Sequence, residues 1–163
     1  MGTINTVNAF LPLLRKSERE RHIVLTASAA YFQPAMRMGA YTVTKYATVG
    51  YGEVLRRELA PEGIDVCIVF PAGMRTRHLE SSAKARPVEL GAARFDPADM
   101  EVMKSSGQVS MDQIRTADDA IRNLLHDLED RQHYSFTHGD YRDQIVAAQR
   151  DVLAAFDRML AGR

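Results

Sequence analysis

Two kinds of hydrophobic pattern alternate along this chain. Residues 22–28 and 64–70 are almost continuously apolar, whereas residues 133–138 alternate between apolar and polar positions. A continuous apolar run between turn residues is typical of a parallel strand that is covered on both faces. Helical spacing of apolar residues predicts helices over four segments, 2–17, 41–60, 117–130 and about 141–156. This alternation predicts an α/β protein with a parallel sheet of three strands.

Some segments depart from this regular pattern. Pro12 lies inside the first predicted helix, where the missing N–H predicts a kink or a break. Thr116 precedes two aspartates and is a predicted helix N-cap. Residues 75–109 are polar, rich in alanine and serine, and only weakly periodic, so we expect one or two short helices on mobile connections there. With 163 residues, the chain is expected to form a single domain, 1–163.

The first predicted strand poses a problem of coverage. A sheet of three strands has at least two edges, and an edge as apolar as residues 22–28 favours aggregation unless something covers it. This strand is therefore expected to need a neighbour that the chain does not supply. Helices 2–17 and 41–60 also carry more apolar surface than one sheet face can hide. We therefore expect a homo-oligomer that forms through these two helices.

Composition narrows the function classes. The chain has 21 Lys and Arg against 21 Asp and Glu, so nothing in its net charge favours nucleic acid. Its apolar runs are too short to cross a membrane, and its first residues do not resemble a signal peptide. The single cysteine, Cys67, is read as a core residue in a reducing compartment, and a cytoplasmic location is expected. The five histidines lack ligand spacing, so no metal site is expected.

The most informative residues are Tyr41, Lys45 and Ser28. A tyrosine and a lysine four residues apart share one face of a helix. A fixed ammonium favours the phenolate form of a neighbouring phenol, and such a phenol can exchange a proton with a substrate hydroxyl near neutral pH. Ser28 closes an apolar strand thirteen residues before Tyr41, where its hydroxyl could hold the substrate oxygen. The pattern indicates hydride chemistry at an alcohol or a carbonyl.

The order of these pieces resembles the C-terminal half of a short-chain dehydrogenase/reductase, from about Ile4 to Leu160. The pieces are a strand ending at Ser28, the Tyr41-x-x-x-Lys45 helix, and a second strand ending in Pro71-Ala72-Gly73-Met74-Arg75-Thr76. The resemblance implies a partial Rossmann-like, doubly wound parallel sheet. It also implies a substrate loop near residues 75–109.

The resemblance further implies a role for each site residue. Tyr41 would be the general acid/base, Lys45 would bind the nicotinamide ribose, and Ser28 would orient the substrate oxygen. The turn after the second strand would hold the nicotinamide of NAD or NADP. Its cofactor-binding residues would be Pro71, Gly73, Met74 and Thr76, together with Tyr41 and Lys45. Ala72 and Met74 stand where the family usually has glycine and valine. There is a purely structural alternative for each: residues 71–73 only end the strand, and Thr76 is a helix N-cap.

The family's glycine-rich phosphate loop has no counterpart in this sequence, so the resemblance implies a truncated family member. The leading hypothesis is an NAD(P)-dependent oxidoreductase that acts on a small alcohol or ketone. An alternative is a catalytically inactive homologue that serves as a dimerisation or interaction module, and a weaker one is a fragment without an independent role. Between Ser28 and Tyr41, Tyr31, Phe32, Met36 and Met38 either line a substrate pocket or pack the loop.

Overall fold

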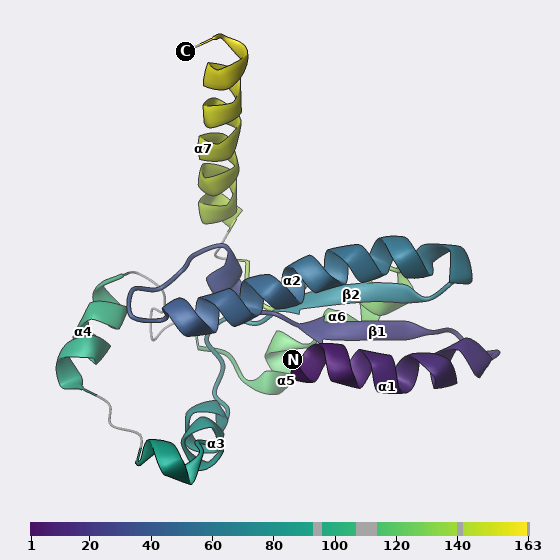
Figure 1. Ribbon diagram of the computed structural model, residues 1–163, viewed down its shortest axis with the longest axis horizontal. Helices are drawn as coiled ribbons and strands as arrows, with labels where there is room; N and C mark the ends of the chain where they lie inside the picture. The colour runs from purple at the N-terminus through teal and green to yellow at the C-terminus, as the bar shows by residue number, and fades with distance from the viewer. Residues whose placement is uncertain (93–95, 107–113, 140–141, 163) are drawn as a thin grey trace.

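The computed structural model describes residues 1–92, 96–106, 114–139 and 142–162, and its centre is a small open sheet (Figure 1). Within the described residues the sheet has three strands, β1 (His22–Thr26), β2 (Asp65–Phe70) and β3 (Tyr134–Phe136), in the order β1-β2-β3. Both pairings are parallel, with Ile23 beside Val66 and Val69 beside Ser135. The predicted α/β class, with its parallel sheet, is confirmed.

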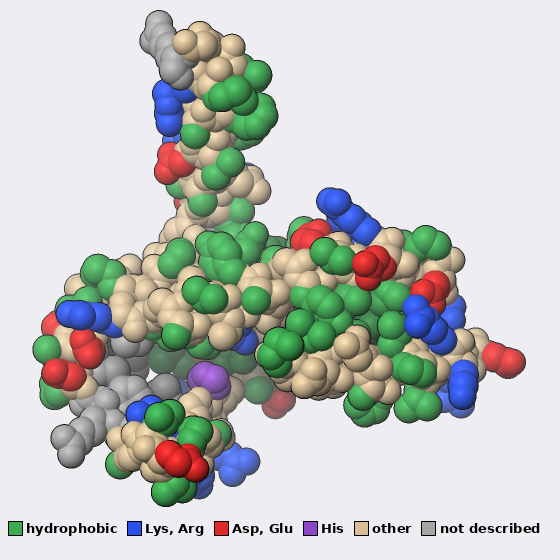
Figure 2. Space-filling view, in the orientation of Figure 1, with side chains coloured by type: hydrophobic (Ala, Val, Ile, Leu, Met, Phe, Trp, Pro, Cys, Tyr) green, Lys and Arg blue, Asp and Glu red, His purple; other side chains and the backbone are tan. Residues whose placement is uncertain are grey.

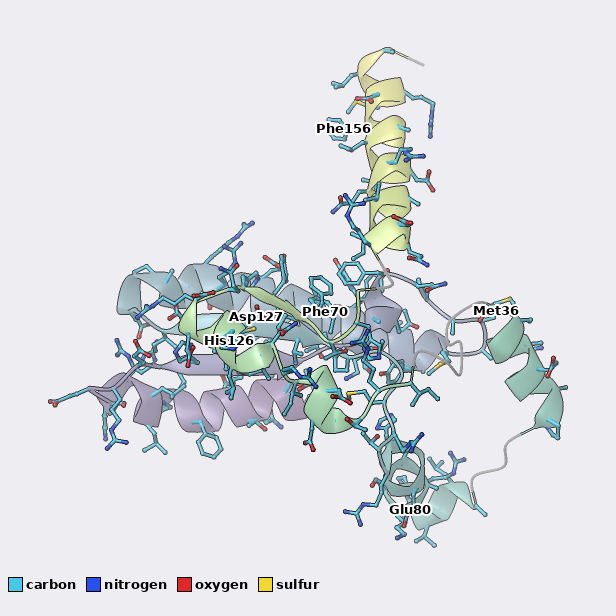
Figure 3. All side chains as sticks on the ribbon, turned by 180° about the vertical axis from the view of Figure 1, so that it is seen from behind. Met36, Phe70, Glu80, His126, Asp127 and Phe156 are labelled. Carbon is cyan, nitrogen blue, oxygen red and sulfur yellow. The ribbon has the colours of Figure 1, made fainter. Side chains whose placement is uncertain are left out.

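Helices cover both faces of this sheet. On one face, α1 (Gly2–Lys16) and α2 (Gly39–Leu59) pack on β1 and β2. Val7 of α1 and Leu55 of α2 meet Ile23 and Leu25 in one buried cluster. On the other face lies α6 (Leu124–Glu129), where the Ser135 hydroxyl donates a hydrogen bond of 2.6 Å to Asp127. Figure 3 shows the sheet from this side, with Asp127 over it.

Gly52 brings α2 unusually close to the sheet. A β-carbon at this position would lie only 2.6 Å from Cδ1 of Ile68 and 3.1 Å from Cδ1 of Leu25. Real side chains do not approach this closely, so a larger residue would push the helix and the strand apart. Gly52 therefore sets the depth at which α2, and with it Tyr41 and Lys45, sits on the strands.

The predicted helix 117–130 is wrong as a single element. The chain instead forms α5 (Ala117–Ala120), a turn, and α6. The N–H of Leu124 bonds to the carbonyl of Ile121 at 2.9 Å, a three-residue step that interrupts the four-residue helical ladder. Apolar spacing alone does not distinguish such a turn from a turn of α-helix. The N-cap was predicted correctly, because Thr116 Oγ1 accepts a hydrogen bond of 3.2 Å from the N–H of Asp119.

A break at Pro12 does not occur, because α1 runs continuously from Gly2 to Lys16. Pro12 and Asn8 both lie on the exposed side of the helix. Proline removes the N–H that would bond to the carbonyl of Asn8, but water can reach that carbonyl. The other predicted elements agree with the structure to within a few residues. Of these, α2 begins at Gly39 and is followed by a 3₁₀ turn, Ala60–Glu62, that Gly63 ends at φ 67°.

The two peripheral regions extend away from the sheet (Figure 1). One holds the short helices α3 (His78–Lys84) and α4 (Pro97–Ser105), with a 3₁₀ turn at Val88–Leu90. This agrees with the one or two short helices expected in 75–109, although residues 93–95 and 107–109 lie outside the described part of the chain. The other is α7 (Arg142–Leu160), which projects from the body as a single helix.

The free edge of β1 is open. Within the described residues, β1 pairs only with β2. Val24, the central residue of β1, is 39% exposed. A groove of about 510 Å³ runs along this edge between α1 and β1 and includes Thr6, Phe10 and Val24. This geometry agrees with the expectation that the strand needs a further neighbour.

Candidate active site

Ser28 lies just beyond the carboxyl end of β1. Its hydroxyl oxygen accepts a hydrogen bond of 3.1 Å from the N–H of Ala30 and so caps a 3₁₀ turn, Ala29–Tyr31. The ladder with β2 continues past the end of the strand, because the N–H of Ala29 donates to the carbonyl of Pro71 at 2.8 Å. Ser28 therefore sits beside the end of β2, as the parallel arrangement requires.

Lys45 is anchored at the same edge of the sheet. Its ammonium donates a hydrogen bond of 3.0 Å to the carbonyl of Thr26, the last residue of β1. The same Nζ atom lies 5.6 Å from the centroid of the Tyr41 ring. Burial lowers the pKa of Lys45. The structure thus brings Tyr41, Lys45 and the segment that carries Ser28 together at the carboxyl end of β1.

The turn after β2 is held by the end of β3. The N–H of Ala72 donates to Thr137 Oγ1 at 3.2 Å, and His138 Nε2 lies 3.1 Å from the carbonyl of Gly73. Because a carbonyl only accepts, this Nε2 carries a proton. Nδ1 of the same ring lies 2.7 Å from Thr137 Oγ1, whose hydroxyl also lies 3.4 Å from the carbonyl of Phe70. Thr137 and His138 are both buried. Together they close a hydrogen-bonded ring that fixes the backbone of Pro71–Gly73.

A second segment fixes the next residues of the turn. Arg115 donates its N–H to the carbonyl of Gly73 at 3.1 Å and accepts from the N–H of Arg75 at 2.9 Å, which makes a parallel bridge with Met74. Thr76 Oγ1 accepts a hydrogen bond of 3.3 Å from the N–H of His78, the first residue of α3. Thr76 thus contacts the start of α3, but it is not the helix N-cap, because that position is Arg77.

Sequence reasoning missed Thr137, His138 and Arg115. The first two could have been found, because they end a predicted parallel strand and the carboxyl ends of parallel strands meet at one edge. Arg115 offers no comparable signal. Its role rests on backbone atoms alone, so its side-chain type carries no information about the bridge to Met74.

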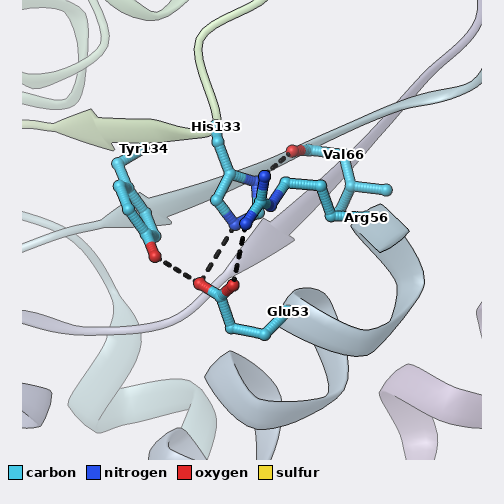
Figure 4. Close-up of polar contacts among 5 residues, drawn as sticks. All are labelled: Glu53, Arg56, Val66, His133 and Tyr134. Atoms are coloured by element: carbon cyan, nitrogen blue, oxygen red, sulfur yellow. Dashed lines mark hydrogen bonds and ion pairs between the residues drawn. The ribbon is translucent and has the colours of Figure 1, made fainter. Parts of the chain in front are cut away.

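At the opposite end of the sheet, a polar cluster fastens α2 to β3 (Figure 4). The two ring nitrogens of His133 face the carbonyl of Val66 at 2.6 Å and a carboxylate oxygen of Glu53 at 3.1 Å. The same carboxylate oxygen accepts from the Tyr134 hydroxyl, and Arg56 pairs with the other at 3.4 Å. Burial raises the pKa of Glu53, but its hydrogen bonds from Tyr134 and His133 outweigh burial and leave it below its ordinary value. This cluster was not predicted either.

The aromatic residues of the loop before α2 pack on the core. The Phe32 ring lies 4.9 Å from the Phe70 ring, and the Tyr31 ring lies 4.6 Å from that of Tyr46. Both loop residues also border a groove of about 710 Å³ between the body and the root of α7. Loop packing, one of the two alternatives, is therefore realised for Tyr31 and Phe32. Met36 is instead 53% exposed, and an ion pair of 3.2 Å joins its neighbour Arg37 to Asp99 of α4.

Two further features were sought in the described part of the chain. No group of three or more His, Cys, Asp or Glu side chains lies close enough there to hold a metal ion. No helix in that part is long and apolar enough to cross a membrane. Cys67 is buried in the core, where burial raises the pKa of its thiol to about 11.

Comparison with known proteins identifies the class of protein. The sequence model of short chain dehydrogenases matches residues 1–87, and the chain belongs to this family. It is 34% identical to human 17-beta-hydroxysteroid dehydrogenase type 2 over 107 residues, which cover 66% of this chain and 27% of that protein. It is 31% identical to mouse retinol dehydrogenase 5 over 129 residues, which cover 79% of this chain and 39% of that protein.

Solved structures agree with the family assignment. A short-chain dehydrogenase/reductase from Burkholderia phymatum in complex with NAD has a TM-score of 0.77 at 23% identity and matches 94% of this chain and 56% of its own. A short-chain dehydrogenase from Streptomyces avermitilis has a TM-score of 0.70 at 26% identity, with 96% of this chain and 56% of its own matched. The three-stranded sheet is thus part of a Rossmann-like fold. The chain spans about half of these structures, and less of the curated relatives.

Proposed function

We propose that the protein to which this chain belongs is an NAD(P)-dependent oxidoreductase in which Tyr41 transfers a proton to or from an alcohol or carbonyl substrate. One observation carries the proposal. The Lys45 ammonium is hydrogen-bonded to the carbonyl of Thr26 and lies 5.6 Å from the Tyr41 ring, at the carboxyl edge of a parallel sheet. A cation held at this place favours negative charge on a nearby oxygen, which is what a proton-transferring phenol requires.

The residues at this edge suit the nicotinamide end of the cofactor. The Lys45 ammonium and the hydroxyls of Tyr41 and Thr76 offer donors for ribose and carboxamide oxygens. The Pro71–Met74 backbone, fixed by Thr137, His138 and Arg115, offers a rigid wall beside them. When bound, the nicotinamide supplies or accepts the hydride. Tyr41 handles the accompanying proton, and Ser28 orients the substrate oxygen.

The substrate class is proposed as a small-molecule alcohol or its carbonyl counterpart. Relatives named for a hydroxysteroid and for retinol support it. The segment about 75–109 is proposed as the substrate loop, and the ion pair between Arg37 and Asp99 ties its second helix to the loop that follows Ser28. We further propose a cytoplasmic location, for which the reduced core residue Cys67 is the support.

The test is Tyr41→Phe in the whole protein that contains this chain. Removing the phenol oxygen should lower kcat/KM by about 10²- to 10⁴-fold, because general acid/base catalysis is lost while the ring still packs. Tyr46→Phe is the matched control. It removes a phenol oxygen from the same helix, and it should leave kcat/KM within about threefold of the wild-type value. Activity of Tyr41→Phe within threefold of wild type, with unchanged circular dichroism, would refute the assignment.

A second candidate function is an inactive dimerisation module. It is favoured by an exposed apolar stripe on α2, formed by Val43, Ala47, Gly50 and Val54, and by exposed Phe10 and Leu13 on α1. A two-fold contact through α1 and α2 would cover both. Val43→Glu should then reduce the oligomer mass measured by light scattering, with Thr44→Glu as the control on the next position. Dimers without turnover in the whole protein would favour this candidate over the first.

A further inference from the structure

The outer half of α7 carries an uncovered apolar side. The helix stands away from the body, with hydrophobic side chains along one side and charged ones along another (Figure 2), and Phe156 points into solvent (Figure 3). The groove between the helix and the body is lined from α7 by Ile145, Ala148 and Gln149, and it ends at Val152 and Leu153. The exposed apolar residues of the outer half, with 56–69% of each side chain exposed, are Val152, Leu153, Phe156, Met159 and Leu160. An amphipathic helix needs a cover for such a face.

The charges of α7 indicate what kind of cover fits. The helix holds three arginines and three aspartates, so it has no net positive charge to attract an anionic membrane surface. At 100° per residue, Arg150 and Asp157 lie together along one edge of the apolar side, whereas Asp151 and Arg158 lie near Ala154 on the opposite side of the helix. The first edge thus holds one positive and one negative charge.

These four charges have no counter-charge within their own helix. The positions three and four residues before and after each of them hold only alanine, valine, leucine or glycine. Neighbours at this spacing are the ones that form ion pairs on a helix surface. No ion pair joins any of the four to another side chain in the described part of the chain. A partner with complementary charges would therefore meet no competing ion pair within this helix.

We propose that the outer half of α7 packs antiparallel against α7 of a second copy of this chain, around a two-fold axis at Ala154. Under this symmetry each edge of the helix meets the same edge of its copy. With a rise of 1.5 Å per residue, Arg150 lies within about 1.5 Å, along the axis, of the level of Asp157 in the second copy. One arrangement therefore forms two ion pairs, both along the edge that holds Arg150 and Asp157.

The apolar residues fit the same register. Val152 lies level with Phe156 of the second copy, and the pair repeats across the axis. Met159 and Leu160 of the second copy come level with Gln149 and Ala148, which line the groove of about 710 Å³ beside Tyr134 and Phe136. The end of each helix would thus cover the groove at the root of the other. A parallel pair would bring the charged edge against the uncharged edge of the second copy, and it would leave both grooves empty.

This interface is separate from the one proposed through α1 and α2. The helix α7 follows β3, and β3 lies at the opposite edge of the sheet from β1. The inference does not rest on the proposed enzymatic function, since it uses no residue of the candidate active site.

Sedimentation velocity on the 163-residue chain over a range of concentrations tests the apolar contact. Phe156→Glu should abolish the association step that α7 provides, whereas Ala154→Glu, which adds the same charge to the opposite side of the helix, should keep it. Far-ultraviolet circular dichroism checks that α7 stays helical in both. The proposal is wrong if the wild-type chain is a monomer throughout, or if Phe156→Glu associates like wild type. It is also wrong if Phe156→Glu instead removes binding to lipid vesicles that wild type shows.

A charge swap tests the antiparallel register. Arg150→Asp alone and Asp157→Arg alone should each weaken association, because like charges then face each other across the axis. The double variant Arg150→Asp/Asp157→Arg should restore it. Because neither residue has a charged residue three or four positions away in its own helix, rescue points to the second copy. In a parallel pair Arg150 and Asp157 would face uncharged residues, so the single variants would associate like wild type, and that result would overturn the proposal.

Discussion

The central strand β2 and the edge strand β1 have similar sequences but different surroundings. From Val66 to Phe70, every side chain of β2 is at most 5% exposed, and Ile68 is fully buried. In β1, by contrast, Ile23 and Leu25 are buried under α1 and α2, while Val24 on the other face is 39% exposed. The groove between α1 and β1 lies along the same edge. Two apolar strands thus differ only in how completely the chain covers them.

This difference bears on the proposed cofactor site. Its fixed contacts come from the end of the edge strand, through Thr26, and from the covered part of the sheet, through Pro71, Gly73 and the end of β3. The open edge of β1 faces the direction in which a larger Rossmann-like sheet continues. The described residues thus include the proposed nicotinamide end of the site, and the sequence contains no glycine-rich turn for the phosphates.

The largest expected effect follows from this separation. Without a phosphate-binding turn, the 163-residue chain should bind NAD(H) and NADP(H) only weakly, because the pyrophosphate normally sits at a helix N-terminus. Isothermal titration calorimetry of the isolated chain measures this directly. The whole protein that contains the chain is the control and should bind one of the two cofactors. Low-micromolar binding by the 163-residue chain would show that the open edge lacks nothing that the cofactor needs.

The same substitution on the two strands tests how much their coverage differs. Val69→Thr on β2 places a hydroxyl in a site that is 5% exposed and should lower the free energy of unfolding by about 1–3 kcal/mol. Val24→Thr on β1 changes a side chain that is 39% exposed and should cost at most about 0.5 kcal/mol. Urea denaturation of both variants gives the comparison. Equal losses would mean that the edge of β1 is covered in solution.

Gly52 tests the packing between α2 and the sheet. Gly52→Ala should destabilise the fold by about 1–2 kcal/mol, because the clash with Ile68 exceeds the gain in helix propensity. Gly39→Ala is the matched control in the same helix, since an added β-carbon there meets nothing within 4 Å. It should be neutral or slightly stabilising. Thermal unfolding that ranks the two variants the other way would show that α2 sits less deeply than the structure indicates.

The sequence predicted the sheet better than its connections. Parallel strands follow from long apolar runs, and the pair Tyr41 and Lys45 follows from helical spacing, so both could be anticipated. The break at Ile121 could not, because a three-residue turn and an α-helical turn present the same apolar spacing. The break that Pro12 allowed for does not occur, for a related reason. Whether a missing N–H breaks a helix depends on the solvent exposure of a carbonyl, which the sequence does not state.

The candidate site shows the same limit. Ser28, Tyr41 and Lys45 carry their chemistry in their side chains, and so the sequence reveals them. The clamp made by Thr137 and His138 depends on which strand ends meet, and the bridge made by Arg115 uses only backbone atoms. Glu53 lies 80 residues before His133 and 81 residues before Tyr134, so no local sequence pattern joins them.

The smallest effect is expected at this last cluster, at the end of the sheet away from the candidate site. Burial, together with the hydrogen bond to Glu53, raises the pKa of Tyr134 to about 12 from an ordinary value of 10. A raised pKa in the folded state means that the stabilisation is complete below pH 10 and is lost as the pH rises from 10 to 12.

Tyr134→Phe should therefore cost about 0.5–1 kcal/mol at neutral pH, at the low end because the residue is 46% exposed. The variant should also lack the fall in folding stability that the Tyr134 hydroxyl causes between pH 10 and 12. Tyr46→Phe, with a side chain of similar exposure, 45%, should change neither quantity appreciably. Urea unfolding at pH 7 and at intervals between pH 10 and 12 measures both. If Tyr134→Phe lost stability with the same alkaline profile as wild type, the bond to Glu53 would not fasten β3 to α2.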